Sequence, residues 1–183
     1  MNDRCLGRFL CCVVLTIGIP VSVLGQGNKE FVLVREDDSI FVYERWIIFP
    51  GSDPPLDARE VKGEFTIKST IYEALRLLKD EARIMRWQKH VTEFRVFPKP
   101  DTTTWIEYSY HDIPWPVSDQ DHLLIYKIEE VEPQRLFITF ESTVNTRLAP
   151  ERDGVTRMNL VGSWTLEQTS TTQIKATYRI ISQ

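Results

Sequence analysis

The stretch TIYEALRLLKDEARIM, residues 70–85, has apolar residues at every third or fourth position, the spacing that places them on one face of a helix. Thr70 and Glu73 stand three residues apart at its start. This pairing predicts a capping box, in which each side chain accepts a hydrogen bond from the backbone N–H of the other residue. The stretch therefore predicts one amphipathic helix, broken near Asp80 and resumed to His90.

Outward from this helix, apolar and polar residues alternate with a period of two, as in half-buried β-strands. Before it we expect strands at residues 31–34, 40–48 and 63–68, with a loop at residues 50–55. After it, turn residues separate six further strands, at residues 91–97, 104–112, 123–131, 136–143, 156–168 and 173–181. Strands, a helix and then a run of strands predict an α+β fold with an antiparallel sheet, rather than a parallel doubly wound sheet.

The N-terminus has the outline of a secretory signal peptide. Arg4 and Arg8 precede an apolar run at residues 9–24 that ends in a small-residue cleavage site. We therefore expect a signal peptide at residues 1–25 and one exported domain, periplasmic or secreted, at residues 26–183. The alternative is an uncleaved N-terminal anchor, although glycine, proline and serine interrupt the run and a membrane span needs about 20 unbroken apolar residues.

The composition narrows the classes of function. The chain carries 22 basic and 26 acidic residues, a net charge of −4, so electrostatic binding to nucleic acid or to an anionic membrane is not expected. All three cysteines lie in the expected signal peptide, which leaves no thiol in the domain for a disulfide, a zinc–thiolate site or a nucleophile. The glycine-rich, catalytic-serine and zinc-binding motifs of common enzymes are absent, so we favour a protein without a cofactor and without enzyme activity.

One cluster invites a metal-binding interpretation. Five side chains of metal-binding type fall within a short segment: His111, Asp112, Asp119, Asp121 and His122. Histidine with carboxylates is a ligand set for zinc or for a harder ion. Prolines separate the two halves of the segment, however, and aspartates at turns normally cap their own backbone. We favour the turn and predict no metal site.

Arg157 and Glu141 form a more informative pair. Both lie in expected strands, which a hairpin at residues 150–154 would make antiparallel neighbours. If the two side chains face inward, they need each other or a polar ligand, because an unpaired buried charge is strongly unfavourable. If they face outward, they form a cross-strand surface pair that contributes under about 1 kcal/mol. Periodicity leaves the face undecided, because a bulge at Gly162 would switch it.

The segment IPWPVSDQD, residues 113–121, resembles the P-W-P-x-S-D-R-D stretch that joins two central strands of the START (StAR-related lipid-transfer) domain. The similarity extends over most of the domain. Residues 31–43 resemble the family's opening strand pair, residues 77–87 its helix-loop-helix, and residues 162–166 and 177–178 its last two strands. The chain is thus similar to a bacterial, exported member of that family.

This resemblance implies an α+β helix-grip (START/Bet v 1-like) fold, in which a curved antiparallel sheet surrounds a cavity and helices follow the first strands. Gln120 stands where the family commonly has arginine, which puts any salt bridge from that position in question. The family continues after its last strand into a long C-terminal helix, whereas this sequence ends at Gln183. We therefore expect residues 26–183 to form a START-like lipid-binding domain that is C-terminally incomplete.

The resemblance also implies a site. In sterol-binding relatives an arginine after a G-V-x-R turn lies in the cavity, with an acidic partner on a neighbouring strand. Residues 154–157 match that turn, so Arg157 is expected to face inward, with Glu141 as its acidic partner. We name no catalytic residue. The candidate ligand-binding residues are Arg157, Glu141, Asn159, Trp105 and Trp115.

These expectations favour binding and transfer of a lipid or other hydrophobic ligand, with transient membrane contact. An alternative from another class is an enzyme on the same fold, similar to polyketide cyclases and aromatases, with His111 or Glu107 as its acid or base. A third is a small interaction protein whose cavity is closed and filled. The sequence leaves the oligomeric state open.

Overall fold

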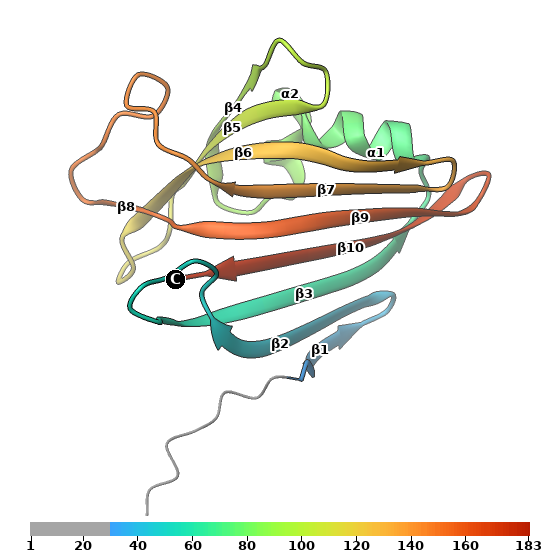
Figure 1. Ribbon diagram of the computed structural model, residues 1–183, viewed down its shortest axis with the longest axis horizontal. Helices are drawn as coiled ribbons and strands as arrows, with labels where there is room; N and C mark the ends of the chain where they lie inside the picture. Colours follow the sequence, from blue (N-terminus) through green and yellow to red (C-terminus); the bar gives the residue numbers. More distant parts are fainter. Residues whose placement is uncertain (1–29) are drawn as a thin grey trace, which may run out of the picture.

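The computed structural model describes residues 30–183, so the expected signal peptide at residues 1–25 lies outside the described residues. Two helices and ten strands follow one another along the chain (Figure 1): β1 Val32–Asp37, β2 Ile40–Ile48, β3 Asp57–Ile67, α1 Ile71–Leu78, α2 Glu81–Trp87, β4 Val91–Pro98, β5 Thr104–His111, β6 Asp119–Glu132, β7 Arg135–Ser142, β8 Val155–Arg157, β9 Leu160–Ser170 and β10 Gln173–Ser182. Within the described part of the chain, neither helix has the length and hydropathy needed to cross a membrane.

The helices form where the three-to-four spacing predicts them. The Thr70 hydroxyl accepts a hydrogen bond from the backbone N–H of Glu73, and the Glu73 carboxylate accepts one from the backbone N–H of Thr70. Asp80 caps α2, because its carboxylate accepts from the N–H groups of Ala82 and Arg83. The capping box and the break near Asp80 are therefore confirmed.

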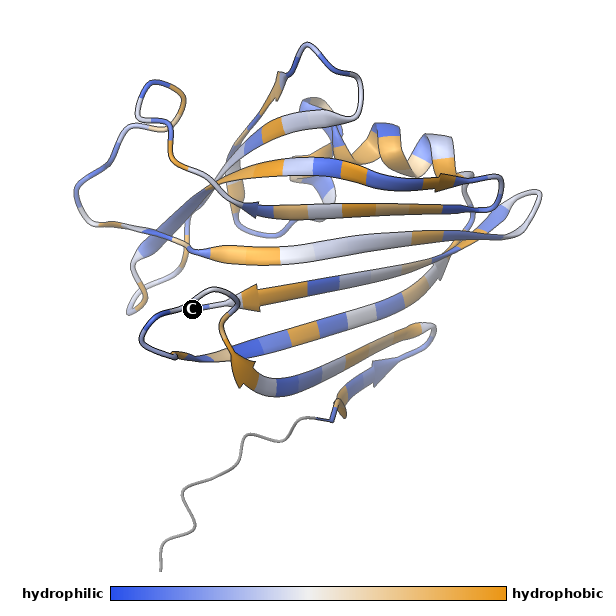
Figure 2. Cartoon of the chain, in the orientation of Figure 1, coloured by the Kyte–Doolittle hydropathy of each residue, from blue (hydrophilic) through white to orange (hydrophobic). Residues whose placement is uncertain are grey.

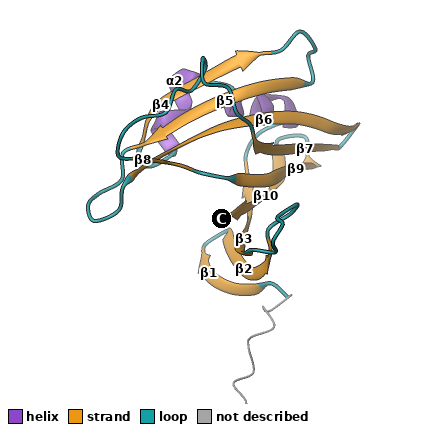
Figure 3. Ribbon diagram, turned by 60° about the vertical axis from the view of Figure 1, so that its left-hand side comes forward, coloured by secondary structure: helices purple, strands orange, loops and turns teal. Residues whose placement is uncertain are grey.

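All ten strands belong to one curved sheet. Its path runs β1-β2-β3-β10-β9-β7-β6-β5-β4 with antiparallel neighbours throughout, and β8 adds a short parallel pairing on β6. The edge strands β1 and β4 do not pair with each other, so the sheet stays open. It bends strongly between the β4–β7 half and the β1–β3 half (Figure 3). The α+β class with a curved antiparallel sheet is therefore confirmed.

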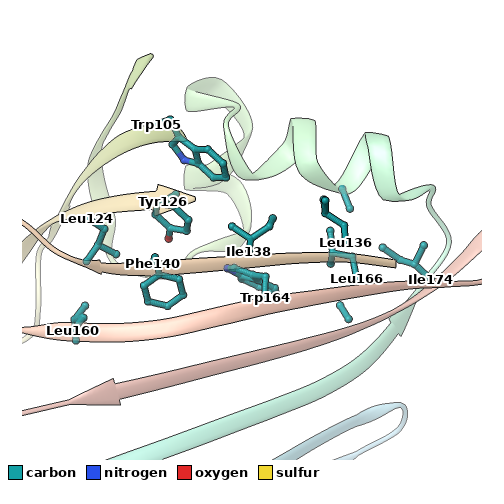
Figure 4. Close-up of a cluster of buried hydrophobic side chains, with 12 residues drawn as sticks. Trp105, Leu124, Tyr126, Leu136, Ile138, Phe140, Leu160, Trp164, Leu166 and Ile174 are labelled. Carbon is teal, nitrogen blue, oxygen red and sulfur yellow. The ribbon is translucent and has the colours of Figure 1, made fainter. Parts of the chain in front are cut away.

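The helices pack on the concave face of this sheet, against β4 and β9. The principal buried cluster lies beneath them and gathers side chains from five strands and α1 (Figure 4): Ala74, Trp105, Leu124, Tyr126, Leu136, Ile138, Phe140, Leu160, Trp164, Leu166, Ile174 and Ala176. These residues alternate along each strand with residues on the convex face. Their alternation fixes which side chains can reach the space between the sheet and the helices.

The β1–β3 half of the sheet is less covered. Hydrophobic residues recur along β2, as the colours of Figure 2 show, and Ile40, Trp46 and Ile48 are each about half exposed. By strand register they share the face of Phe65 on β3, which is the concave face.

The chain after β7 corrects one expectation. The expected strands at residues 136–143 and 156–168 are antiparallel neighbours where β7 pairs with β9. Residues 155–157, however, form β8, which pairs in parallel with β6, so no hairpin at residues 150–154 joins the two strands. The expected strand at residues 156–168 is instead interrupted at Met158 and Asn159. The hairpin prediction is wrong because residues 143–154 form a long connection that crosses the convex face, where Leu148 and Ala149 pack on Tyr108 and Leu123.

Candidate functional site: a pocket on the concave face

A pocket of about 610 Å³ lies between the concave face of the sheet and α2. Strands from both halves of the sheet and the end of α2 supply its walls. Apolar side chains supply most of the wall surface: Ile40, Phe65, Leu78, Ile84, Trp87, Leu124, Met158, Leu160, Trp164 and Ile180. The polar lining residues are Gln88, Lys89, Glu107, His111, Gln120, His122, Tyr126, Tyr178 and Ser182, and Gly63 completes the wall.

A second, smaller chamber of about 210 Å³ continues beneath α1. It shares Phe65, Leu78, Trp87 and Trp164 with the larger pocket, so the two spaces adjoin. Its remaining lining residues are all apolar: Ile67, Ala74, Leu77, Leu166 and Ala176. The combined space therefore has an apolar end under α1 and a mixed end toward β5 and β6.

The polar end is organised around Glu107 on β5, whose side chain is only 8% exposed. Its Oε1 accepts a hydrogen bond from the Tyr126 hydroxyl at 3.4 Å and lies 3.5 Å from Nε2 of His122. The His122 ring is 5.3 Å from the ring of His111, and Nε2 of His111 is 3.1 Å from the Ser109 hydroxyl. Alternate residues of β5 and residues of β6 thus converge on one polar cluster inside a largely apolar pocket.

His111 is held in its neutral form. Burial is the main reason that its pKa falls from 6.5 to about 4, and the neighbouring His122 and His90 lower it further, whereas Asp121 opposes the shift. At neutral pH the ring therefore carries no charge into the pocket. It supplies one nitrogen that accepts and one that donates a hydrogen bond.

Arg157 does not pair with Glu141. Its Nε and Nη2 atoms donate to the two carboxylate oxygens of Asp121, at 2.5 and 2.9 Å, and Asp121 also accepts from the Tyr108 hydroxyl. Gln120 and His122 line the pocket, so the alternating Asp121 faces the convex side, and Arg157 follows it there. The expected pairing and the inward orientation are both wrong, because β8 lies beside β6 rather than beside β7.

The other predicted site residues lie in separate places. Glu141 is exposed on the convex side opposite Val161, and Asn159 is exposed and donates to the side chain of Gln183. Trp115 is 91% exposed in the loop between β5 and β6. Trp105 is buried, with its ring stacked on Tyr126. None of these residues, nor Arg157, lines the pocket among the described residues, and their role in ligand binding stays a prediction.

The five candidate metal ligands do not converge either. His111 and His122 face the pocket, whereas Asp121 pairs with Arg157 on the opposite side. Asp119 accepts hydrogen bonds from the Tyr110 hydroxyl and the backbone N–H of Ile113, and so closes the loop that contains residues 113–118. Across residues 30–183 no group of three such side chains is placed to hold a metal ion.

The sequence analysis named Glu107 as a group for an alternative enzyme, His111 for that enzyme and as a candidate metal ligand, and His122 as a candidate metal ligand. It did not name Tyr126 or Tyr178. The alternation along β5 carried a usable signal, because Trp105, Glu107, Ser109 and His111 share one face. That signal shows which residues share a face but not which face is concave. Strand order supplies the missing information.

Comparison with solved structures agrees with this architecture. A STAR-related lipid transfer protein from Xanthomonas axonopodis superposes with a TM-score of 0.65 at 24% identity, over 82% of this chain and 80% of that one. Human StAR-related lipid transfer protein 5 gives a TM-score of 0.69 at 16% identity, over 85% and 73% of the two chains. Human STARD10 gives 0.67 at 14% identity, over 83% and 60%.

No family model matches the sequence, and no curated protein matches it. The structural likenesses nevertheless define the class of fold: an open, curved antiparallel sheet that holds two helices on its concave face. The chain has a START-like fold.

Proposed function

We propose that this protein binds a lipid or another hydrophobic small molecule in the concave pocket and transfers it to or from a membrane. The observation that supports the proposal is a pocket of about 610 Å³, mostly apolar in its walls, with polar groups gathered at one end. Ligand sites typically occupy about 300–1,000 Å³ and combine apolar walls with a few polar groups that orient the ligand. Burial of apolar ligand surface would supply the affinity, at ~25 cal/mol per Å².

Two further points support the proposal. The solved structures similar to this fold include proteins named for lipid transfer, from a bacterium and from human. The loop that carries the exposed Trp115 also joins two pocket residues, His111 and Gln120, so an exposed aromatic side chain lies at the pocket's end. We further propose that transfer takes place outside the cytoplasm, as the expected signal peptide implies.

The experiment is mass spectrometry of organic extracts from the purified protein, compared with two leucine variants of β3. Gly63 lines the pocket, and a Cβ built there meets nothing within 4 Å, so Gly63→Leu fills the pocket without a clash at its first carbon. Thr66→Leu adds a leucine to the exposed, convex face of the same strand. A hydrophobic compound that is recovered from the parent and from Thr66→Leu, and lost from Gly63→Leu, is expected. Equal recovery from both variants would refute binding in the pocket.

One observation favours a second candidate, an acid–base enzyme. Glu107, His122 and a neutral His111 converge in the pocket, and such clusters serve general acid–base catalysis. The same extracts separate the candidates when the captured compound is added back to the protein. A carrier returns it unchanged, whereas an enzyme converts it to a product of different mass or retention time, and Glu107→Gln abolishes the conversion.

A further inference from the structure

Glu107 is a buried carboxylate with unused hydrogen-bonding capacity. Its two contacts, to Tyr126 and His122, are long and both involve Oε1. Among the described residues, Oε2 of Glu107 accepts no hydrogen bond. It is not one of the fully buried atoms that lack a partner, so this oxygen is accessible from the pocket that Glu107 lines. A buried carboxylate that lacks full hydrogen bonding is unfavourable until a donor reaches it.

The pocket offers this carboxylate little positive charge. Among the described lining residues Glu107 is the single carboxylate and no arginine is present. His111 is neutral at pH 7, because burial and the nearby histidines lower its pKa to about 4. Lys89 is exposed at the rim, and Arg157 faces the other side of the sheet. Apart from the weak contact with His122, a cation that Glu107 could bind closely must come from the ligand.

Aromatic rings surround the same position. Tyr126 stacks on Trp105 at 4.8 Å between centroids and contacts Phe140, which contacts Tyr178 in turn; Tyr178 lies 4.3 Å from Trp164. Burial chiefly, and the charge of Glu107 next, raise the pKa of both Tyr126 and Tyr178, so both hydroxyls lie within electrostatic reach of that carboxylate. The faces of tyrosine and tryptophan rings attract cations. The Trp105 ring already has Lys79 Nζ 3.8 Å from its centroid and stacks on Tyr126, so the rings that remain for a ligand are those that line the pocket, Tyr126, Tyr178 and Trp164.

The apolar chamber under α1 determines how the ligand is oriented in the pocket. It adjoins the pocket through Phe65, Leu78, Trp87 and Trp164, and all its lining residues are apolar. A polar group placed there would lose its hydrogen bonds to water without replacement. An aliphatic or alicyclic tail fits the chamber, and the polar end of the same molecule then meets Glu107.

We infer that the ligand is an amphiphile whose buried end is a cationic amine, or failing that a hydroxyl group, bound by Glu107 among tyrosine and tryptophan rings, and that fatty acids are excluded. This inference rests on the proposed function and names its ligand class. An ammonium group forms a charge-assisted hydrogen bond with a carboxylate, whereas a hydroxyl forms a neutral-donor bond of lower strength. A ligand carboxylate meets like charge in a site of low dielectric constant.

The test ranks three ligands of one chain length, dodecylamine, dodecanol and dodecanoate, by displacement of a hydrophobic fluorescent dye from the purified protein at pH 7. We expect the order amine, alcohol, carboxylate, with the amine at least about tenfold tighter than the carboxylate, the ratio that about 1.4 kcal/mol produces. In Glu107→Gln the amine and the carboxylate should fall within about threefold of each other.

The control removes the same charge elsewhere. Glu141→Gln alters an exposed carboxylate on the convex side, so general attraction of amines to an acidic protein changes equally in both variants. The tenfold preference should persist in Glu141→Gln. If the parent protein binds the carboxylate as tightly as the amine, or if Glu107→Gln keeps the preference, the inference is overturned while the proposed function stands. If no C12 ligand displaces the dye, the proposed function itself fails. If Glu107→Gln does not fold, the order of affinities of the three ligands for the parent protein still tests the inference.

Discussion

Arg157 and Asp121 form a bidentate ion pair on the side of the sheet away from the pocket. Asp121 is almost fully buried, and its two oxygens bind the two donor nitrogens of one guanidinium. Arg157 also donates to the backbone carbonyl of Ala149, which belongs to the long connection over the convex face. The pair therefore fastens β8 and that connection to β6.

The first prediction is that Arg157→Ala destabilises the protein by about 2–3 kcal/mol and leaves ligand affinity unchanged. Removing one partner of a buried pair commonly costs about 3–5 kcal/mol, and the partial exposure of Arg157 reduces that figure. Arg35→Ala is the control, because Arg35 pairs with Asp37 at a mostly exposed site and its loss should change stability by under about 1 kcal/mol. Urea unfolding measures both. Lost ligand affinity at unchanged stability would support the cavity role expected from the sequence instead.

The second prediction concerns pH. The pKa of His111 is about 4 in the folded protein and about 6.5 in the unfolded chain, so between these values the unfolded chain binds a proton that the folded protein does not. Stability should therefore fall as the pH decreases from about 6.5 to about 4. We expect the urea midpoint to drop between pH 7 and pH 5, and to drop less in His111→Gln. Identical drops in the two proteins would contradict the assignment.

At the scale of elements, Gly162 allows β9 to pack closely against its neighbours. A Cβ at this position would lie 2.2 Å from the backbone oxygen of Arg179 and 2.2 Å from the ring of Phe140. Phe140 lies directly opposite Gly162 on β7, and its ring contacts Tyr126 and Tyr178. The absent side chain of Gly162 thus leaves room for the aromatic rings beside the pocket.

The third prediction compares two glycine-to-alanine changes in strands of one sheet. Gly162→Ala should destabilise the protein by about 1–3 kcal/mol, the usual effect of overpacking, because the obstructing Arg179 oxygen belongs to the backbone and cannot rotate away. Gly63→Ala is the matched control, since its Cβ meets nothing within 4 Å. Thermal unfolding of the two variants gives the comparison. Equal shifts in the melting temperatures of the two variants would mean that strand propensity, not close packing, causes the destabilisation.

The elements themselves were largely predictable from the sequence. The capping box at Thr70, the break at Asp80 and most strands follow from local spacing and turn chemistry, which act within a few residues. The pairing of β8 with β6 was not predictable from spacing, because parallel register joins segments over thirty residues apart and depends on the path of the intervening connection. The same limit misassigned the partner of Arg157.

The site was predictable only in part. The PWP-containing segment indicated the fold, and alternation along β5 grouped Glu107 with His111, but neither pattern says which face of the sheet is concave. Tyr126 is a diagonal neighbour of Glu107 on the adjacent strand β6, whereas Tyr178 comes within reach of Glu107 because β10 curves around the same space. Curvature is a property of the whole sheet, so the sequence of a single strand does not show toward which face the sheet bends.

At the scale of the whole molecule, exposed aromatic residues lie at both ends of the sheet. Trp115 lies in the loop between β5 and β6, at the end of the sheet that holds His111 and Gln120. Tyr72 is also exposed, at the start of α1, which in Figure 1 lies at the opposite end. Tryptophan side chains favour the interface between membrane and water. If ligands enter and leave near the polar cluster, the Trp115 end should be the one that meets the membrane.

The last prediction is that Trp115→Ser slows ligand transfer between vesicles by about tenfold, while the affinity for ligand in solution stays unchanged. Burying a large apolar side chain in the membrane interface would contribute about 1.5–3 kcal/mol to membrane binding. A serine at position 115 would not make this contribution. The expected binding is to neutral vesicles and insensitive to salt, because the protein carries a net charge of −4 and gains nothing from anionic headgroups.

Tyr72→Ser is the control: it removes an exposed aromatic side chain at the other end of the sheet and should leave the transfer rate unchanged. Transfer of a fluorescent lipid from donor to acceptor vesicles measures the rate. An equal loss in both variants would show that general surface hydrophobicity drives docking, and an unchanged rate in Trp115→Ser would mean that the membrane meets another part of the molecule.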